Sequence, residues 1–148
     1  MPVTSAKRSA DDQLWTRLVL LFAGVERDLG KVLQAQGELK ASEYRALGLL
    51  VTADENELRI QDLSEQLGLD ESSVSRLVAR MERAGLVQRD LCANDRRGVY
   101  AVLTADGRRR HAAVRQAYER ALAAALDTAA QDDRLNRLVA ALRSSVTR

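Results

Sequence analysis

Several residue types are scarce in this 148-residue chain, and each scarcity narrows the choice of fold. The single cysteine, Cys92, excludes an internal disulfide. The single proline, Pro2, leaves no Pro-rich linker between domains. Aromatic residues make up only 3% of the chain while hydrophobic residues make up 46%. This balance favours amphipathic helices built on Leu, Val and Ala, and it argues against an all-β sandwich.

Long hydrophobic runs and clustered metal ligands are missing as well. No apolar run approaches the ~20 residues that a membrane span needs, and residues 1–12 lack the apolar segment of a signal peptide. We therefore expect a cytoplasmic protein without a membrane partner. One histidine and one cysteine, far apart in sequence, cannot fill a four-ligand metal site. Without a Gly-rich phosphate loop or a Ser nucleophile elbow, we expect no cofactor and no enzyme activity.

Charge of one sign is not in large excess, because the formal net charge is only +2. The positive excess is local: residues 70–110 contain nine arginines and six acidic residues, and the rest contains 14 basic and 15 acidic residues. Arginine supplies 20 of the 23 basic side chains. Its flat guanidinium suits phosphates and guanine edges, although an arginine-rich proteome would produce the same bias.

Helical periodicity dominates both ends of the sequence. Apolar residues at near-heptad spacing predict a helix of about seven turns over 12–36, and a second helix over 41–52. Two more helices are predicted over 105–129, capped by Thr104, and over 133–146. Such terminal helices commonly dimerise, and the alternative is that they pack on their own central unit. The side chains that we expect the last helix to bury are Leu135, Leu138, Val139 and Leu142.

The centre of the chain predicts two short helices joined by a tight turn. Apolar spacing predicts the first helix over 60–67, after a polar turn at 54–57, and Gly68 ends it. Asp70 is a suitable N-cap for the second helix, over 71–84. The short connection between the two indicates a helix-turn-helix.

A β-hairpin is predicted directly after these helices. Residues 86–91 and 99–103 have strand-like composition, and the turn-prone stretch Asn94-Asp95-Arg96-Arg97-Gly98 separates them. The predicted fold class is mainly α with a small β-hairpin wing (α+β), a winged helix-turn-helix flanked by dimerisation helices. Within one compact domain, we expect residues 37–103 to bind DNA and residues 1–36 and 104–148 to form the helical dimerisation region.

The helix over 71–84 presents candidate DNA contacts once its apolar side chains are buried. Arg76 lies in its N-terminal half, where recognition helices reach base edges in the major groove. Arg80 and Arg83 are placed to bind phosphates, and the serines suit either target. An ordinary solvated surface is the alternative. The candidates on this helix are Ser72, Ser73, Ser75, Arg76, Arg80 and Arg83.

The loop of the hairpin supplies further candidates. Arg97, with Arg96 before it, can enter the minor groove, where narrow A·T stretches concentrate negative potential. Asp95 cannot bind phosphate, but its spacing allows its carboxylate to brace the Arg97 guanidinium. The alternative is that Asp95 shapes the hairpin as an Asx-turn residue.

Several stretches in a fixed order together resemble the MarR family of bacterial transcriptional regulators, over nearly the whole chain. They are Leu63-Ser64-Glu65-Gln66-Leu67-Gly68, Ser73-Val74-Ser75-Arg76-Leu77-Val78, Met81-Glu82-Arg83-Ala84-Gly85-Leu86-Val87-Gln88-Arg89, and Asn94-Asp95-Arg96-Arg97-Gly98 leading to Leu103-Thr104-Ala105-Asp106-Gly107. The resemblance implies a six-helix homodimer joined through its terminal helices, with an Asp-x-Arg wing at the minor groove. It also implies a palindromic operator in double-stranded DNA, read in major grooves about 34 Å apart.

The resemblance further implies a small aromatic or anionic effector that binds between the dimerisation helices and the winged unit. Candidate walls of that pocket are Trp15, Arg17, Phe22, Tyr44 and His111, for which core or surface packing is the alternative. We thus expect a sequence-specific repressor that the effector releases from DNA. Three alternatives stay open. One is a redox-responsive regulator that uses Cys92, whose arginine-rich neighbourhood favours a reactive thiolate. The others are a winged-helix module that binds another protein and a constitutive DNA-binding protein without an effector.

Overall fold

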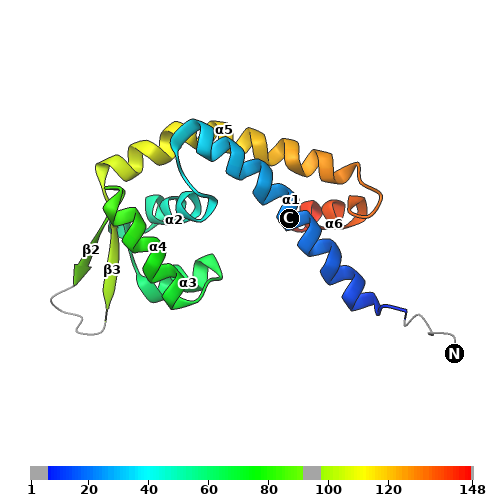
Figure 1. The fold of residues 1–148 in the computed structure, drawn as a ribbon, viewed down its shortest axis with the longest axis horizontal. Coiled ribbons are helices and arrows are strands. Elements are labelled where there is room, and N and C mark those ends of the chain that lie inside the picture. The colour runs from blue at the N-terminus through cyan, green and yellow to red at the C-terminus, as the bar shows by residue number, and fades with distance from the viewer. Residues whose placement is uncertain (1–6, 92–97, 148) are drawn as a thin grey trace, which may run out of the picture. The chain divides into compact units, whose positions relative to one another are not determined.

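The computed structural model describes residues 7–91 and 98–147. The chain forms two compact units: a central unit of residues Gly30–Tyr118, and a terminal unit of Met1–Leu29 together with Glu119–Arg148. Two long helices, α1 (Ala10–Gly37) and α5 (Ala105–Ala130), contribute to both units (Figure 1). Across the described residues, no helix is long and apolar enough to span a membrane.

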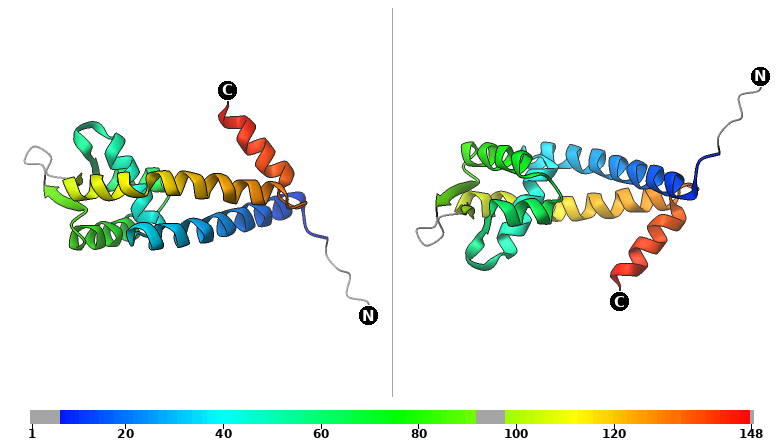
Figure 2. Two further views of the ribbon diagram at one scale, coloured as in Figure 1. Left: turned by 90° about the horizontal axis from the view of Figure 1, so that it is seen from above. Right: turned by 90° about the horizontal axis from the view of Figure 1, so that it is seen from below.

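The terminal unit combines parts of α1 and α5 with the last helix, α6 (Asn136–Val146). Figure 2 shows α6 leaving the end of α5 at an angle after a short turn. In that turn the Asp132 carboxylate accepts hydrogen bonds from the backbone N–H of Arg134, at 2.8 Å, and from its guanidinium, at 2.7 Å. Because of this turn, α6 begins three residues later than the sequence predicted.

A small apolar cluster holds this unit together. It is centred on Leu21 of α1 with Leu135 and Val139, and all three are at most 8% exposed. The prediction that Leu142 is buried is wrong, because its side chain is 44% exposed. The cluster covers only the first turns of α6, and every described residue from 140 onwards is exposed.

The central unit contains three short helices. They are α2 (Ala41–Thr52), α3 (Ile60–Leu67) and α4 (Glu71–Arg83), with a 3₁₀ turn, η1 (Asp54–Asn56), after α2. The bounds of α2 and α3 agree with the predicted ranges, and α4 ends one residue early. Gly68 ends α3 in the left-handed conformation, with φ of 66°, which glycine adopts without strain. Asp70 then begins α4, because its carboxylate accepts the backbone N–H of Ser73 at 2.7 Å.

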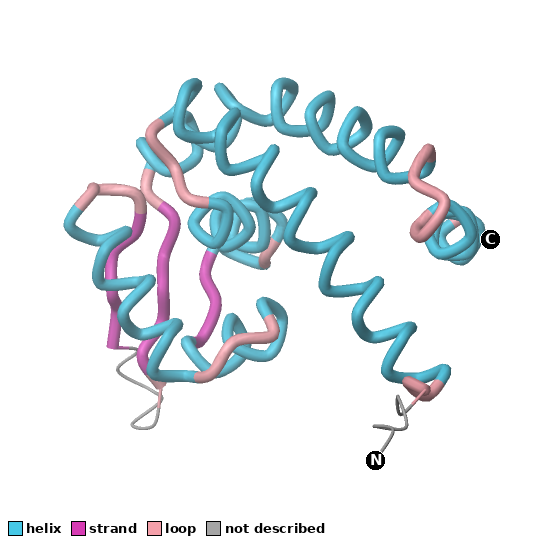
Figure 3. The backbone as a smooth tube through the Cα atoms, turned by 45° about the vertical axis from the view of Figure 1, so that its right-hand side comes forward, coloured by secondary structure: helices cyan, strands magenta, loops and turns pink. Residues whose placement is uncertain are grey.

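Three antiparallel strands form the sheet of the central unit (Figure 3). The predicted hairpin is present as β2 (Val87–Leu91) and β3 (Val99–Leu103). A third strand, β1 (Glu57–Arg59), pairs with the other edge of β3, so the strand order is β1-β3-β2. The sequence indicated only a polar turn up to residue 57. β1 is too short to show strand periodicity, and its pairing with β3 makes it a strand.

The core of the central unit fixes the orientation of α4. As predicted, α4 buries Val74, Leu77, Val78 and Met81, each at most 1% exposed. These side chains pack with apolar residues of the other helices and of the sheet in one cluster. The opposite face of α4 is therefore turned to solvent. These findings confirm the predicted mainly helical fold with a small hairpin.

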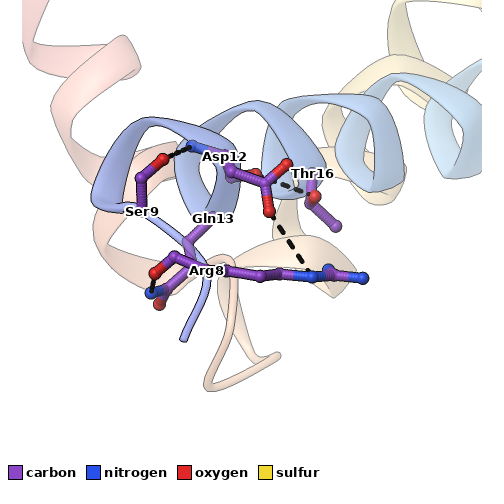
Figure 4. Close-up of polar contacts among 5 residues, drawn as sticks. All are labelled: Arg8, Ser9, Asp12, Gln13 and Thr16. Carbon is purple, nitrogen blue, oxygen red and sulfur yellow. Dashed lines mark hydrogen bonds and ion pairs between the residues drawn. The ribbon is translucent and has the colours of Figure 1, made fainter. Parts of the chain in front are cut away.

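The first turn of α1 is fixed by short polar contacts (Figure 4). The Ser9 hydroxyl accepts the backbone N–H of Asp12 at 3.1 Å and caps the helix. The Thr16 hydroxyl donates to the Asp12 carbonyl at 2.8 Å, and the Arg8 guanidinium lies 3.4 Å from the Asp12 carboxylate. α1 therefore begins two residues earlier than the sequence predicted.

Candidate nucleic-acid interface

The solvent-facing side of α4 presents most of the predicted DNA contacts together. Ser72, Arg76 and Arg83 are exposed, and Ser73 and Ser75 are half-buried. Because α4 is held by four buried side chains, this face is rigid enough to present a fixed pattern of donors. The structure thus brings the predicted serines and arginines of this helix onto one surface.

A polar cluster forms at the start of α4. The Asp70 carboxylate accepts the hydroxyl protons of Ser72, at 2.7 Å, and Ser73, at 3.0 Å, in addition to the Ser73 backbone N–H. The hydrogen bond from Ser72, followed by those from Ser73, lowers the pKa of Asp70 from 3.8 to about 2. The Arg76 guanidinium donates to the Ser73 hydroxyl at 3.3 Å. Asp70 is ionised at neutral pH and orders the residues around Arg76.

Arg80 differs from its neighbours on α4. Its guanidinium lies 3.9 Å from the Glu43 carboxylate on α2, and the two side chains are 38% and 12% exposed. Glu43 also accepts the backbone N–H of Lys40 at 3.1 Å, which helps to cap α2. Part of the Arg80 charge is therefore balanced within the protein, whereas Arg83 is open to solvent. Phosphate binding by either residue stays a prediction.

Arg89 attaches the wing strand β2 to α4. Its backbone N–H donates to the Glu82 carboxylate at 2.9 Å, and its guanidinium donates to the Ser75 carbonyl at 2.8 Å. In the sequence, Arg89 only ends one of the stretches that resemble the MarR family, and it has no predicted role. No local pattern marks its role, because its partner Ser75 lies 14 positions earlier on another element.

Arg59 on β1 is a second arginine that the sequence analysis missed. Its guanidinium donates to the Tyr100 hydroxyl on β3 at 2.8 Å and lies over the Tyr100 ring, 5.6 Å from the centroid. It belongs to the strand that the sequence did not predict. Its placement near the hairpin follows from the pairing of Arg59 with Tyr100.

The predicted residues of the hairpin loop, Asp95, Arg96 and Arg97, lie outside the described residues, as does Cys92. Their roles stay predictions. Within residues 7–91 and 98–147, no three His, Cys, Asp or Glu side chains gather as metal ligands.

The candidate effector residues fall into two groups. In the central unit the buried Tyr44 ring stacks on His111, with centroids 4.8 Å apart, and on Tyr118, with centroids 4.0 Å apart. Trp15, Arg17 and Phe22 belong to the terminal unit, where all three are exposed. The structure thus brings Tyr44 and His111 together, and a pocket made with the other three stays a prediction.

The central unit has the features of a winged helix-turn-helix protein. They are a helix-turn-helix, an antiparallel hairpin that follows it, and an outer face with arginines on the second helix. Comparison with known proteins finds similar sequences and structures. Residues 38–98 match the sequence model of the MarR family. The HTH-type transcriptional regulator FarR of Neisseria gonorrhoeae is 36% identical over 72 residues, which are 49% of this chain and 48% of FarR. The match thus spans about half the length of that curated relative. Over residues 38–98 the chain is therefore similar to the MarR family, in agreement with the resemblance of its motifs.

Solved structures agree over most of the chain. Sco3205, a MarR family transcriptional regulator of Streptomyces coelicolor solved in complex with DNA, has 25% identity and a TM-score of 0.76, with 94% of this chain and 88% of Sco3205 covered. AbsC, a MarR family regulator of the same organism, has 26% identity and a TM-score of 0.76, with 95% of each chain covered. FarR, Sco3205 and AbsC are all described as transcriptional regulators.

Proposed function

We propose that this protein regulates transcription by binding specific double-stranded DNA with α4 and the β2–β3 wing. The observation that carries the proposal is the outer face of α4, where Arg76 and Arg83 are exposed beside an ordered serine cluster. The complex of Sco3205 with DNA supports it, because this chain shares the fold of Sco3205 over most of both lengths.

The binding unit in this proposal is a homodimer. The terminal unit exposes large apolar side chains that water would otherwise surround: Leu14, Trp15, Val19, Leu20, Phe22, Leu142 and Val146. An exposed apolar surface of this kind is typical of protein–protein interfaces. A two-fold dimer would present two copies of α4 to successive major grooves and would read a palindromic operator.

The regulator is further proposed to be a cytoplasmic repressor that a small aromatic or anionic molecule releases from DNA. The stacked rings of Tyr44, His111 and Tyr118 support an aromatic effector, because they place aromatic surface between α2 and α5. Thermal-shift screening with aromatic acids, followed by competition with bound DNA, tests this part. A compound that raises the melting temperature without displacing DNA would contradict it.

Replacement of Arg76 tests base reading. We expect Arg76→Ala to cost about 1–3 kcal/mol on the selected operator and to relax the preference at one base pair, because a guanidinium contact to guanine is lost. The measurement is fluorescence titration against the operator and single-base variants that come from genomic selection. Arg137→Ala, at an exposed position of α6, is the matched control and should leave binding unchanged.

Two results would contradict different parts of the proposal. An equal loss on every sequence for Arg76→Ala would remove its base-reading role and leave DNA binding in place. If the unaltered protein shows no salt-sensitive binding to any duplex, the regulator proposal itself fails and a protein-binding role becomes the better explanation.

A further inference from the structure

A hollow of about 480 Å³ lies beside the hairpin in the central unit, and Gly98 and Val99 line it toward the loop end of the hairpin. Three parts of the unit border it: β1 with the start of α3, the first half of α4, and the strands of the hairpin. The polar side chains that line it are Arg59, Gln61, Glu71, Ser75 and Arg89. Among the described residues that line the hollow, there are therefore two guanidinium groups and one carboxylate.

Both guanidinium groups are fixed by bonds within the protein. Arg89 donates to the Ser75 carbonyl and Arg59 donates to the Tyr100 hydroxyl, each at 2.8 Å. The Arg89 guanidinium has five N–H donors, and its bond to the Ser75 carbonyl uses one. The groups are therefore held in place at little further cost in side-chain entropy when they bind an anion.

The hollow adjoins the proposed DNA-reading face. Glu71 and Ser75 border it from α4, and Arg76 directly follows Ser75 in the same helix. A duplex that places a base edge at Arg76 carries its sugar-phosphate backbone along the edge of that groove, within a few ångströms of the bases. The volume of the hollow exceeds that of one phosphate group. Ordered water commonly fills the remaining space in protein–DNA interfaces.

We propose that this hollow binds one phosphate of the DNA backbone through Arg59 and Arg89. The inference rests on the proposed function and adds a backbone contact beside the hairpin that the motifs did not indicate. Arg89 has two roles in it: it binds the phosphate and it holds β2 against α4. The negative carboxylate of Glu71 repels the phosphate, so it weakens the binding of every DNA sequence.

The test compares Arg59→Ala, Arg89→Ala and Glu71→Gln with the control Arg137→Ala in titrations of the operator between 50 mM and 200 mM salt. Loss of one phosphate contact lowers the salt slope by about 0.9. For each arginine variant, the fall in affinity over this salt range should therefore shrink roughly threefold to fourfold. Base preference should remain, and Glu71→Gln should bind every sequence more tightly.

A second measurement locates the contact. Operators with one neutral methylphosphonate at each backbone position are titrated with the unaltered protein and with the Arg59→Ala variant. The Arg59→Ala variant keeps the two bonds of Arg89 to α4, so β2 stays attached to this helix. We expect the two changes to be non-additive at one phosphate in each half-site and additive at all others.

The inference is overturned if Arg59→Ala and Arg89→Ala keep the full salt slope, or if every methylphosphonate effect is additive with Arg59→Ala. In either case the unaltered protein still binds its operator, so the failure concerns this phosphate site only. Absence of binding by the unaltered protein is the separate result that would reject the proposed function.

Discussion

At the scale of single residues, Gly107 is closely packed in the central unit. A Cβ atom added there would clash with the Leu86 carbonyl oxygen and would lie 2.9 Å from the Leu103 side chain. Backbone atoms cannot yield as the end of a flexible side chain does. Gly107 therefore lets the first turn of α5 lie against the segment that links α4 to β2.

We expect Gly107→Ala to lower the free energy of unfolding by about 1–3 kcal/mol, because an overpacked core forces the backbone to shift. Denaturant unfolding measures the change. The matched control is Gly30→Ala in α1, where an added Cβ meets nothing within 4 Å and should stabilise the helix by about 0.5–1 kcal/mol. If both variants had the same free energy of unfolding, the close contact at Gly107 would not contribute to stability.

Single residues of the candidate site also differ in how well the sequence predicts their positions. The outward position of Arg76 was predictable, because the apolar spacing of α4 fixes which side chains face solvent. The involvement of Arg59 was not predictable. Its partner Tyr100 lies 41 positions away, and no spacing in the sequence connects a strand of three residues to its neighbour in a sheet.

At the scale of elements, Thr104 joins the start of α5 to the end of the helix-turn-helix. Its hydroxyl accepts the Gly107 backbone N–H at 3.0 Å and donates to the Gly85 carbonyl at 2.6 Å. The first bond confirms the predicted cap. The second, between segments 19 residues apart, could not be predicted because it depends on how α5 packs.

Thr104→Ala should lower the free energy of unfolding by about 1–2 kcal/mol, because both hydrogen bonds are lost. Thr104→Ser keeps the hydroxyl and serves as the control, with a loss of less than about 1 kcal/mol. Thermal unfolding of the two variants checks the difference. An equal loss in both would assign the effect to the Thr104 methyl group and not to the cap.

The elements themselves differ in how well the sequence predicts them. α2, α3 and β3 follow local periodicity and turn residues, so their bounds were predicted correctly. The start of α6 was predicted three residues early, because Asp132 forms a turn with Arg134 that apolar spacing does not show. β1 was missed because a short edge strand is defined by its partner.

At the scale of the whole molecule, the exposed apolar side chains of α1 predict the assembly. Trp15, Val19 and Phe22 recur at i, i+4 and i+7, so they share one side of the helix. Trp15 and Phe22 are 67% and 63% exposed. Our proposal assigns this side to the partner of a homodimer.

We expect Trp15→Glu combined with Phe22→Glu to yield a monomer in analytical ultracentrifugation. Affinity for a two-half-site operator should then fall by at least about 100-fold, because the second half-site no longer binds at high effective concentration. Lys31→Glu changes the charge at another exposed position of α1 and should leave the dimer intact. A dimeric double variant would move the interface to another surface.

The sequence by itself determined the helices, the helix-turn-helix, the hairpin and the resemblance to the MarR family. These features depend on local spacing, on caps such as Asp70 and on turn residues such as Gly68. Only the tertiary structure decided that β1 completes the sheet, that Arg80 lies beside Glu43, and that Arg59 and Arg89 line one hollow. The physical reason is that these contacts join residues far apart in sequence, and they exist only after the core has placed their elements together.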